Sequence, residues 1–189
     1  MNSSRSLVSH ARRRSAFPAA ALLAAAFVVG AAGTAGAQDQ ASGTFTVKGA
    51  ATRFAFAYTF WKANVFTGKP DLYVLFSDVA IPPDTIPKND DGVGKMAALV
   101  RENKVHAVEL HLAPQYRKLD NASDLAVYHV GLSPARFGMG GITTYEATTV
   151  TDTTLEGRAR TDGPQNHDGV AWQFDVQFKV AIPPPAKGT

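Results

Sequence analysis

The sequence contains no cysteine among its 189 residues. Without thiols the protein cannot form disulfide bonds, use a catalytic thiolate, bind a metal through sulfur or carry a lipid-anchored amino terminus. The fold must therefore be stabilised by packing. The roughly 150 residues that follow the export signal described below are enough for one self-supporting apolar core, so the lack of disulfide bonds does not prevent folding.

Acidic side chains are absent from residues 1–37, which have the pattern of an export signal. Four arginines form its basic region: Arg5, Arg12, Arg13 and Arg14. An apolar run follows at 19–29, and Ala35 and Ala37 supply the small residues that a signal peptidase accepts before Gln38. This run is shorter than the roughly 20 residues of a transmembrane helix. We therefore expect cleavage, and no transmembrane anchor in the mature protein.

The leader predicts a periplasmic or secreted bacterial protein. Arg13 and Arg14 loosely resemble a twin-arginine signal, which exports folded proteins. Phe17 stands one place later than that pattern prefers, so general secretion is the better interpretation.

Positive charge is also scarce once the leader is removed. The whole chain has 19 basic and 16 acidic side chains, but four of the basic ones lie in the leader. The mature part therefore has one more acidic than basic residue. A nucleic-acid-binding protein needs a clustered basic surface, so we expect no nucleic-acid partner.

The clearest structural pattern is the alternation at 170–182, where every even position is apolar and most odd positions are polar. Successive side chains of a strand point to opposite faces, so this pattern predicts a long strand with one buried face. The segment at 154–160 also alternates, and a loop at 162–169 with Asp-Gly pairs near both ends joins the two. We predict that they form an antiparallel hairpin.

Other segments also predict strands, separated by turn residues. They lie at 44–48, 53–62, 72–81, 105–112, 125–130 and 142–150. Between 92 and 104 the apolar period becomes helical, and Asp90 or Asp91 is available as a cap. We predict one all-β, mainly antiparallel domain over 38–189, a β-sandwich of about seven to nine strands with one short helix. A closed β-barrel is the alternative.

The best candidate metal ligands are Glu109, His111 and His129. Glu109 and His111 are two residues apart, so they share a strand face, and His129 follows on the next predicted strand. A slip of one residue in the strand pairing moves His129 to the other face. The competing interpretation, which we favour, is a solvated polar face for Glu109 and His111 and a hydrogen-bonded His129. His106 is predicted to be partly buried, and no cofactor is expected.

The other reactive residue types give weaker patterns. Ser77 is followed by Asp78, but no G-x-S-x-G motif is present and no pattern places a histidine beside Ser77. The glycines at 138–141 lack the Gly-Lys-Ser/Thr of a phosphate loop and predict a flexible corner between strands.

Two stretches together suggest a relationship: L-Y-V-L-F-S-D-V-A-I-P-P at 72–83, and L-E-G-R-A-R at 155–160 followed by a loop and W-Q-F-D-V-Q-F-K-V at 172–180. The sequence resembles uncharacterised secreted bacterial all-β proteins, a domain of unknown function. This resemblance implies an exported all-β domain. It brings no catalytic residue to this chain.

Three functions are consistent with these patterns. The leading hypothesis is a non-enzymatic module that binds a protein or another cell-envelope component through loops or an exposed sheet face. The second is a small hydrolase, either metal-dependent, with Glu109, His111 and His129, or built on Ser77. The third is a carrier of an apolar ligand, suggested by an aromatic row predicted to share one strand face. That row comprises Phe54, Phe56, Tyr58 and Phe60.

Overall fold

The computed structural model describes residues 39–64, 68–113, 116, 118–119 and 125–184. These residues form an antiparallel β fold with one short helix, which confirms the predicted fold class. The strands are β1 (Asp39–Val47), β2 (Ala50–Ala63), β3 (Pro70–Ser77), β4 (Ala107–Leu112), β5 (Leu125–Tyr128), β6 (Arg136–Met139), β7 (Thr143–Val150), β8 (Thr154–Thr161), β9 (Gln165–His167) and β10 (Val170–Ala181). The helix is α1 (Asp90–Arg101).

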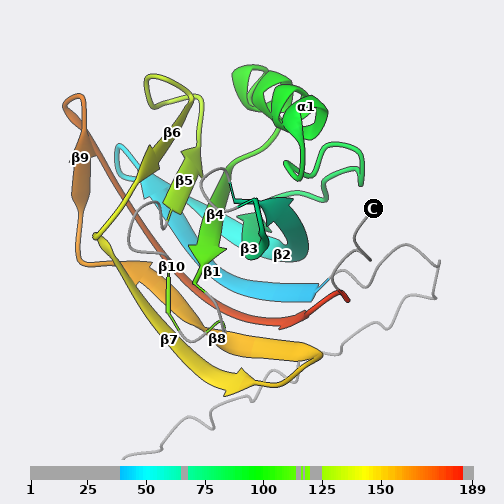
Figure 1. Cartoon of the computed structure of the whole chain (residues 1–189). Helices are drawn as coiled ribbons and strands as arrows, with labels where there is room; N and C mark the ends of the chain where they lie inside the picture. The colour runs from blue at the N-terminus through cyan, green and yellow to red at the C-terminus, as the bar shows by residue number, and fades with distance from the viewer. Residues whose placement is uncertain (1–38, 65–67, 114–115, 117, 120–124, 185–189) are drawn as a thin grey trace, which may run out of the picture. The chain divides into compact units, whose positions relative to one another are not determined.

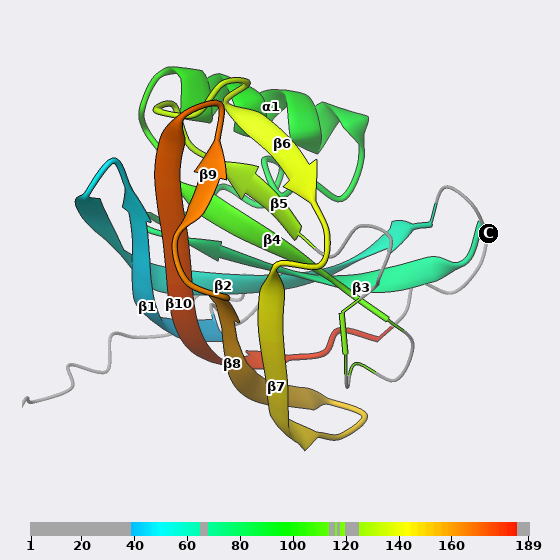
Figure 2. The same cartoon turned by 90° about the vertical axis from the view of Figure 1, so that its left-hand side faces the viewer.

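The strands belong to one hydrogen-bonded sheet in the order β6-β5-β4-β3-β2-β1-β10-β8-β7, and β9 pairs separately with β10. This sheet curls into a half-barrel (Figures 1 and 2). The curl brings β6, at one end of the order, beside β9 (Figure 2). Side chains make this contact: the rings of Phe137 on β6 and His167 on β9 stack with centroids 3.8 Å apart.

Two apolar clusters occupy the two faces of the curled sheet. The inner core lies on the concave face and includes Phe45, Leu110, Trp172 and Phe178. The outer core lies under α1, where Met96 and Val100 are fully buried among residues of β2 to β5. In Figure 1, α1 covers the β3 to β5 region and leaves β7, β8 and β10 uncovered. The convex face of those strands is therefore open.

Strand β10 fulfils the sequence prediction closely. Its even residues from Trp172 to Val180 are buried, whereas its odd residues are exposed or half-buried. It pairs antiparallel with β8, as predicted, and it lies between β8 and β1 rather than at an edge. The predicted hairpin loop contains β9, which pairs with the first residues of β10.

The predicted aromatic row on β2 is wrong. Phe54 lies in the inner core, whereas Phe60 lies in the outer core and Tyr58 packs against it. The change of face coincides with a β-bulge in the neighbouring strand, where the β1–β2 register shifts between Gln40 and Gly43. An extra residue in one strand offsets the alternation along the pair.

Two smaller predictions are also corrected. The helix is capped by Asn89, whose side chain accepts a hydrogen bond from the backbone N–H of Gly92, and not by Asp90 or Asp91. Of the glycines predicted to form a corner between strands, Gly138 instead belongs to β6 and pairs with Ala126 of β5, whereas Gly140 and Gly141 follow β6 in its connection to β7. No helix within the described ranges is long and apolar enough to cross a membrane.

Candidate functional site

The three predicted metal ligands do not come together. Glu109 lies beside Tyr128 of the outer core. His129, in contrast, packs edge-on against Phe45 of the inner core, with ring centroids 5.3 Å apart. Across the residues that the structure describes, no group of three or more histidine, aspartate or glutamate side chains is arranged to hold a metal ion.

Glu109 is the most buried carboxyl group of the described chain, only 4% exposed, and the predicted solvated position is therefore wrong. The hydroxyl of Tyr128 donates to its Oε2 over 2.9 Å, and Nε of Arg136 donates to that hydroxyl over 3.0 Å. Burial raises the pKa of Glu109, although the positive charge of Lys62 and the bond from Tyr128 oppose the shift. The carboxyl group is thus enclosed by protein partners.

His111 is also buried, at 8% exposed, rather than solvated as predicted. Its Nε2 lies 2.8 Å from Oδ2 of Asp71, and its ring stacks on Tyr73 with centroids 4.4 Å apart. Asp71 also accepts a hydrogen bond from the side chain of Asn64. These contacts fix the imidazole within the sheet.

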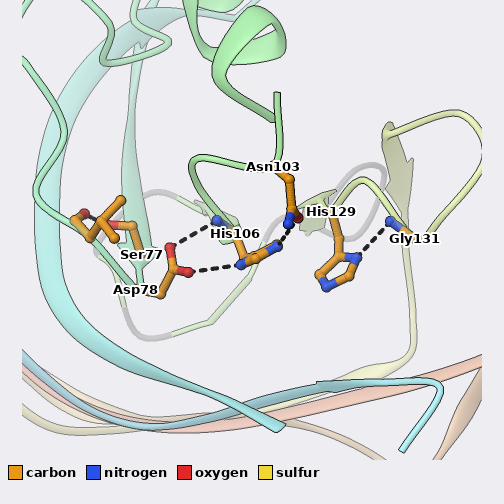
Figure 3. Close-up of polar contacts among 7 residues, drawn as sticks. Ser77, Asp78, Asn103, His106, His129 and Gly131 are labelled. Carbon is orange, nitrogen blue, oxygen red and sulfur yellow. Dashed lines mark hydrogen bonds and ion pairs between the residues drawn. The ribbon is translucent and has the colours of Figure 1, made fainter. Parts of the chain in front are cut away.

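A second polar cluster lies at the ends of β3 and β4 (Figure 3). Oδ1 of Asp78 accepts a hydrogen bond from the backbone N–H of His106, and Oδ2 of Asp78 lies 2.8 Å from Nδ1 of the same histidine. The other ring nitrogen, Nε2, lies 3.0 Å from Oδ1 of Asn103. Both ring nitrogens of His106 therefore contact side-chain oxygen atoms. Burial opposes ionisation of Asp78, but the bonds from His106 outweigh it and lower the pKa of this carboxyl group.

His129 stacks on His106 in the same cluster, with ring centroids 4.3 Å apart. Its Nδ1 accepts a hydrogen bond from the backbone N–H of Gly131, which confirms the prediction of a hydrogen-bonded histidine. Burial, and then the neighbouring charge of His106, lower the pKa of His129 to about 4. The His129 ring is therefore neutral at pH 7.

Ser77 does not complete a catalytic triad with this cluster. Its hydroxyl donates to the backbone carbonyl of Val79 over 2.7 Å, although its neighbour Asp78 bonds to His106. Sequence reasoning singled out Ser77 and Asp78 together but missed the contact of Asp78 with His106. That contact follows from the β3–β4 register, which places Ser77 opposite Ala107.

A polar groove of about 450 Å³ crosses the open convex face of β1, β10, β8 and β7. One row of its lining residues runs directly across the four strands, because each member pairs with the next. The row consists of Ser42, Gln177, Arg158 and Glu146. Beside it, Gln40 pairs with Lys179 and Lys179 pairs with Glu156. Hydroxyl, amide, carboxylate and cationic groups thus line one surface.

A β-bulge occurs in each of the two outer strands of the groove, β1 and β7. The β1–β2 register shifts between Gln40 and Gly43, and the β7–β8 register shifts between Ala147 and Thr149. Each bulge has a glycine beside it. A Cβ on Gly43 would lie 2.1 Å from the backbone oxygen of Asp175, and a Cβ on Gly157 would lie 2.5 Å from that of Glu146. The close backbone approach therefore requires glycine at both places.

Sequence reasoning missed this groove as a site. The outward polar positions of 154–160 and 170–182 were visible in the sequence. The groove also needs residues of β1 and β7, and the sequence does not show that these two strands flank β10 and β8 in the sheet. Comparisons of the chain with protein-family models, with curated proteins and with solved structures give no match.

Proposed function

We propose that this protein is an exported, non-enzymatic binding module of the bacterial cell envelope. The observation that carries the proposal is the polar groove on the convex face of β1, β10, β8 and β7. Its volume lies within the range of about 300 to 1,000 Å³ that is typical of ligand sites. The predicted leader supports a location outside the cytoplasm.

The other polar clusters support binding in the groove rather than chemistry elsewhere. Both nitrogens of the His106 ring contact protein oxygens, and the Glu109 carboxyl group is held by Tyr128. In the groove, by contrast, the amide groups of Gln40 and Gln177 are on exposed side chains. Such groups offer donors and acceptors to a ligand without first breaking a buried network.

The proposal is tested by obstructing the groove without disturbing the core. Gln177→Trp places a large side chain in the groove, and tryptophan is well tolerated on a strand. Gln173→Trp is the matched control, because Gln173 is also an exposed outward residue of β10 but does not line the groove. The full-length protein and both variants are expressed and exported, and each is mixed with washed cell-envelope fractions. Depletion from the supernatant measures binding.

We expect Gln177→Trp to lose envelope binding and Gln173→Trp to retain it. Equal binding by both variants would show that the groove is not the binding surface. Failure of the parent protein to bind any envelope fraction would contradict the envelope assignment itself.

A further inference from the structure

We infer that the groove binds an uncharged, hydroxyl-rich ligand, namely a neutral saccharide chain. This inference rests on the proposed binding function and adds the chemical class of the ligand. Its basis is the composition and the arrangement of the side chains that line the groove.

The charges in the groove are balanced. The lining contains two carboxylates, Glu146 and Glu156, and two cations, Arg158 and Lys179. Lys179 lies 3.7 Å from Glu156 across the strands, and Arg158 forms two hydrogen bonds with Asp175. The four charged lining residues sum to zero and each cation has an anionic partner, so a highly charged polymer would find no excess of opposite charge in the groove. The groove therefore favours a ligand without net charge.

The uncharged positions have the groups that hydroxyls need. Gln40 and Gln177 each present an amide with two donor hydrogens and one acceptor oxygen, and Ser42 and Thr148 add hydroxyl groups. A sugar hydroxyl both donates and accepts, so it can bond to an amide and to a neighbouring carboxylate at once. The two cross-strand rows repeat this mixture along the groove, which suits a ligand with many hydroxyls.

The two rows place their polar groups on neighbouring strands about 4.8 Å apart, so an extended ligand lying across the strands can contact several of these groups in succession. Phe178 borders the groove but its side chain is buried in the inner core, so the lining presents no aromatic face on which a sugar ring could stack. Binding must depend on hydrogen bonds that compete with water, each contributing about 1 kcal/mol net. We therefore expect a weak dissociation constant, on the order of 0.1 mM.

The test uses defined oligosaccharides and the exported protein. Cellohexaose, maltohexaose and chitohexaose are the neutral probes, and hexamers of galacturonate and of glucosamine are the anionic and cationic comparators. Binding is measured by titration calorimetry at two salt concentrations. Gln40→Ala combined with Gln177→Ala removes both amides from the groove, and Gln173→Ala is the control on the same face of β10.

We expect at least one neutral hexamer to bind with little dependence on salt, and both charged hexamers to bind less tightly. Loss of two hydrogen bonds should weaken that binding about tenfold or more in the double variant, with Gln173→Ala within twofold of the parent. If no neutral hexamer binds but groove-dependent envelope binding persists, the ligand class is wrong and the proposed function stands. Binding of the charged hexamers, or of an envelope protein at the groove, would likewise overturn the saccharide assignment.

Discussion

Acidification should destabilise the protein through His129. The pKa of this imidazole is about 4 in the folded protein, against an ordinary value of 6.5. Between these two pH values the unfolded chain binds a proton at this position and the folded chain does not. Stability therefore falls as the pH decreases from about 6.5 towards 4, and above pH 6.5 the His129 contribution is constant. Protonation would also place a donor at Nδ1, facing the N–H of Gly131.

The size of the effect follows from the two pKa values. Each pKa unit is worth 1.36 kcal/mol, so a shift from 6.5 to about 4 corresponds to about 3.4 kcal/mol once the pH is well below 4. At pH 4.5 the part of this stability that is already lost is about 2.5 kcal/mol before any screening by water. The His129 ring is partly exposed, and water screens its interactions with His106 and Lys48. We therefore expect about half of that value, or roughly 1 to 1.5 kcal/mol.

Urea denaturation at pH 7 and at pH 4.5 measures this loss for the parent protein and for His129→Asn. The asparagine does not titrate, and its side-chain oxygen can still accept a hydrogen bond from Gly131. All other ionisable groups are the same in both proteins, so the difference between the two pH-dependent losses isolates His129. A His129→Asn variant that loses as much stability on acidification as the parent would refute the reasoning.

Three further predictions concern the core, the backbone and the leader. Trp172→Ala removes a side chain that is 1% exposed, so it should cost about 3 to 5 kcal/mol in urea denaturation; a loss below about 1 kcal/mol would contradict its place in the core. Gly43→Ala should lower the melting temperature, because the added Cβ would meet the backbone oxygen of Asp175 at 2.1 Å. Gly94→Ala meets nothing within 4 Å in α1 and should raise stability by about 0.5 to 1 kcal/mol, so melting shifts of the same sign in the two glycine variants would show that contact geometry does not decide the outcome. The exported protein should begin at Gln38 by mass spectrometry, whereas an intact amino terminus would contradict the predicted cleavage.

The strand content could be predicted from the sequence because it depends on local alternation. On β10 the even positions from Val170 to Val180 are apolar without exception, and each one from Trp172 onward is buried. The pairing of β10 with β8 was also predictable, because a short loop with Asp-Gly pairs joins adjacent antiparallel strands.

The positions of the aromatic residues on β2 could not be predicted, because the strand changes the face on which they lie. This change coincides with a bulge in the paired strand, β1. The bulge near Ser42 in β1 offsets the pairing opposite Phe54 and Phe56. Nothing within the β2 sequence itself records this extra residue in its neighbour.

The polar clusters show the same dependence on distant residues. Glu109 and His111 alternate with apolar residues, a pattern that predicts a solvated face. They are buried because β3 and β5 flank β4 and because side chains from those strands, Tyr73 and Tyr128, cover them. Likewise, the contact between Asp78 and His106 depends on strand register, which a single sequence does not specify.

The groove follows from the same alternation that builds the core, since the groove and the core use opposite faces of β10. The inward residues Trp172 and Phe178 are buried, whereas the outward residues Gln177 and Lys179 line the groove. If the groove binds as proposed, stability and binding depend on alternate positions of one strand, and substitutions of the outward amides should alter ligand affinity with little change in the free energy of unfolding. The bulge glycines are different, because a Cβ on Gly43 or Gly157 would meet backbone atoms of strands that carry groove residues. Substitution at either glycine should change stability and binding together.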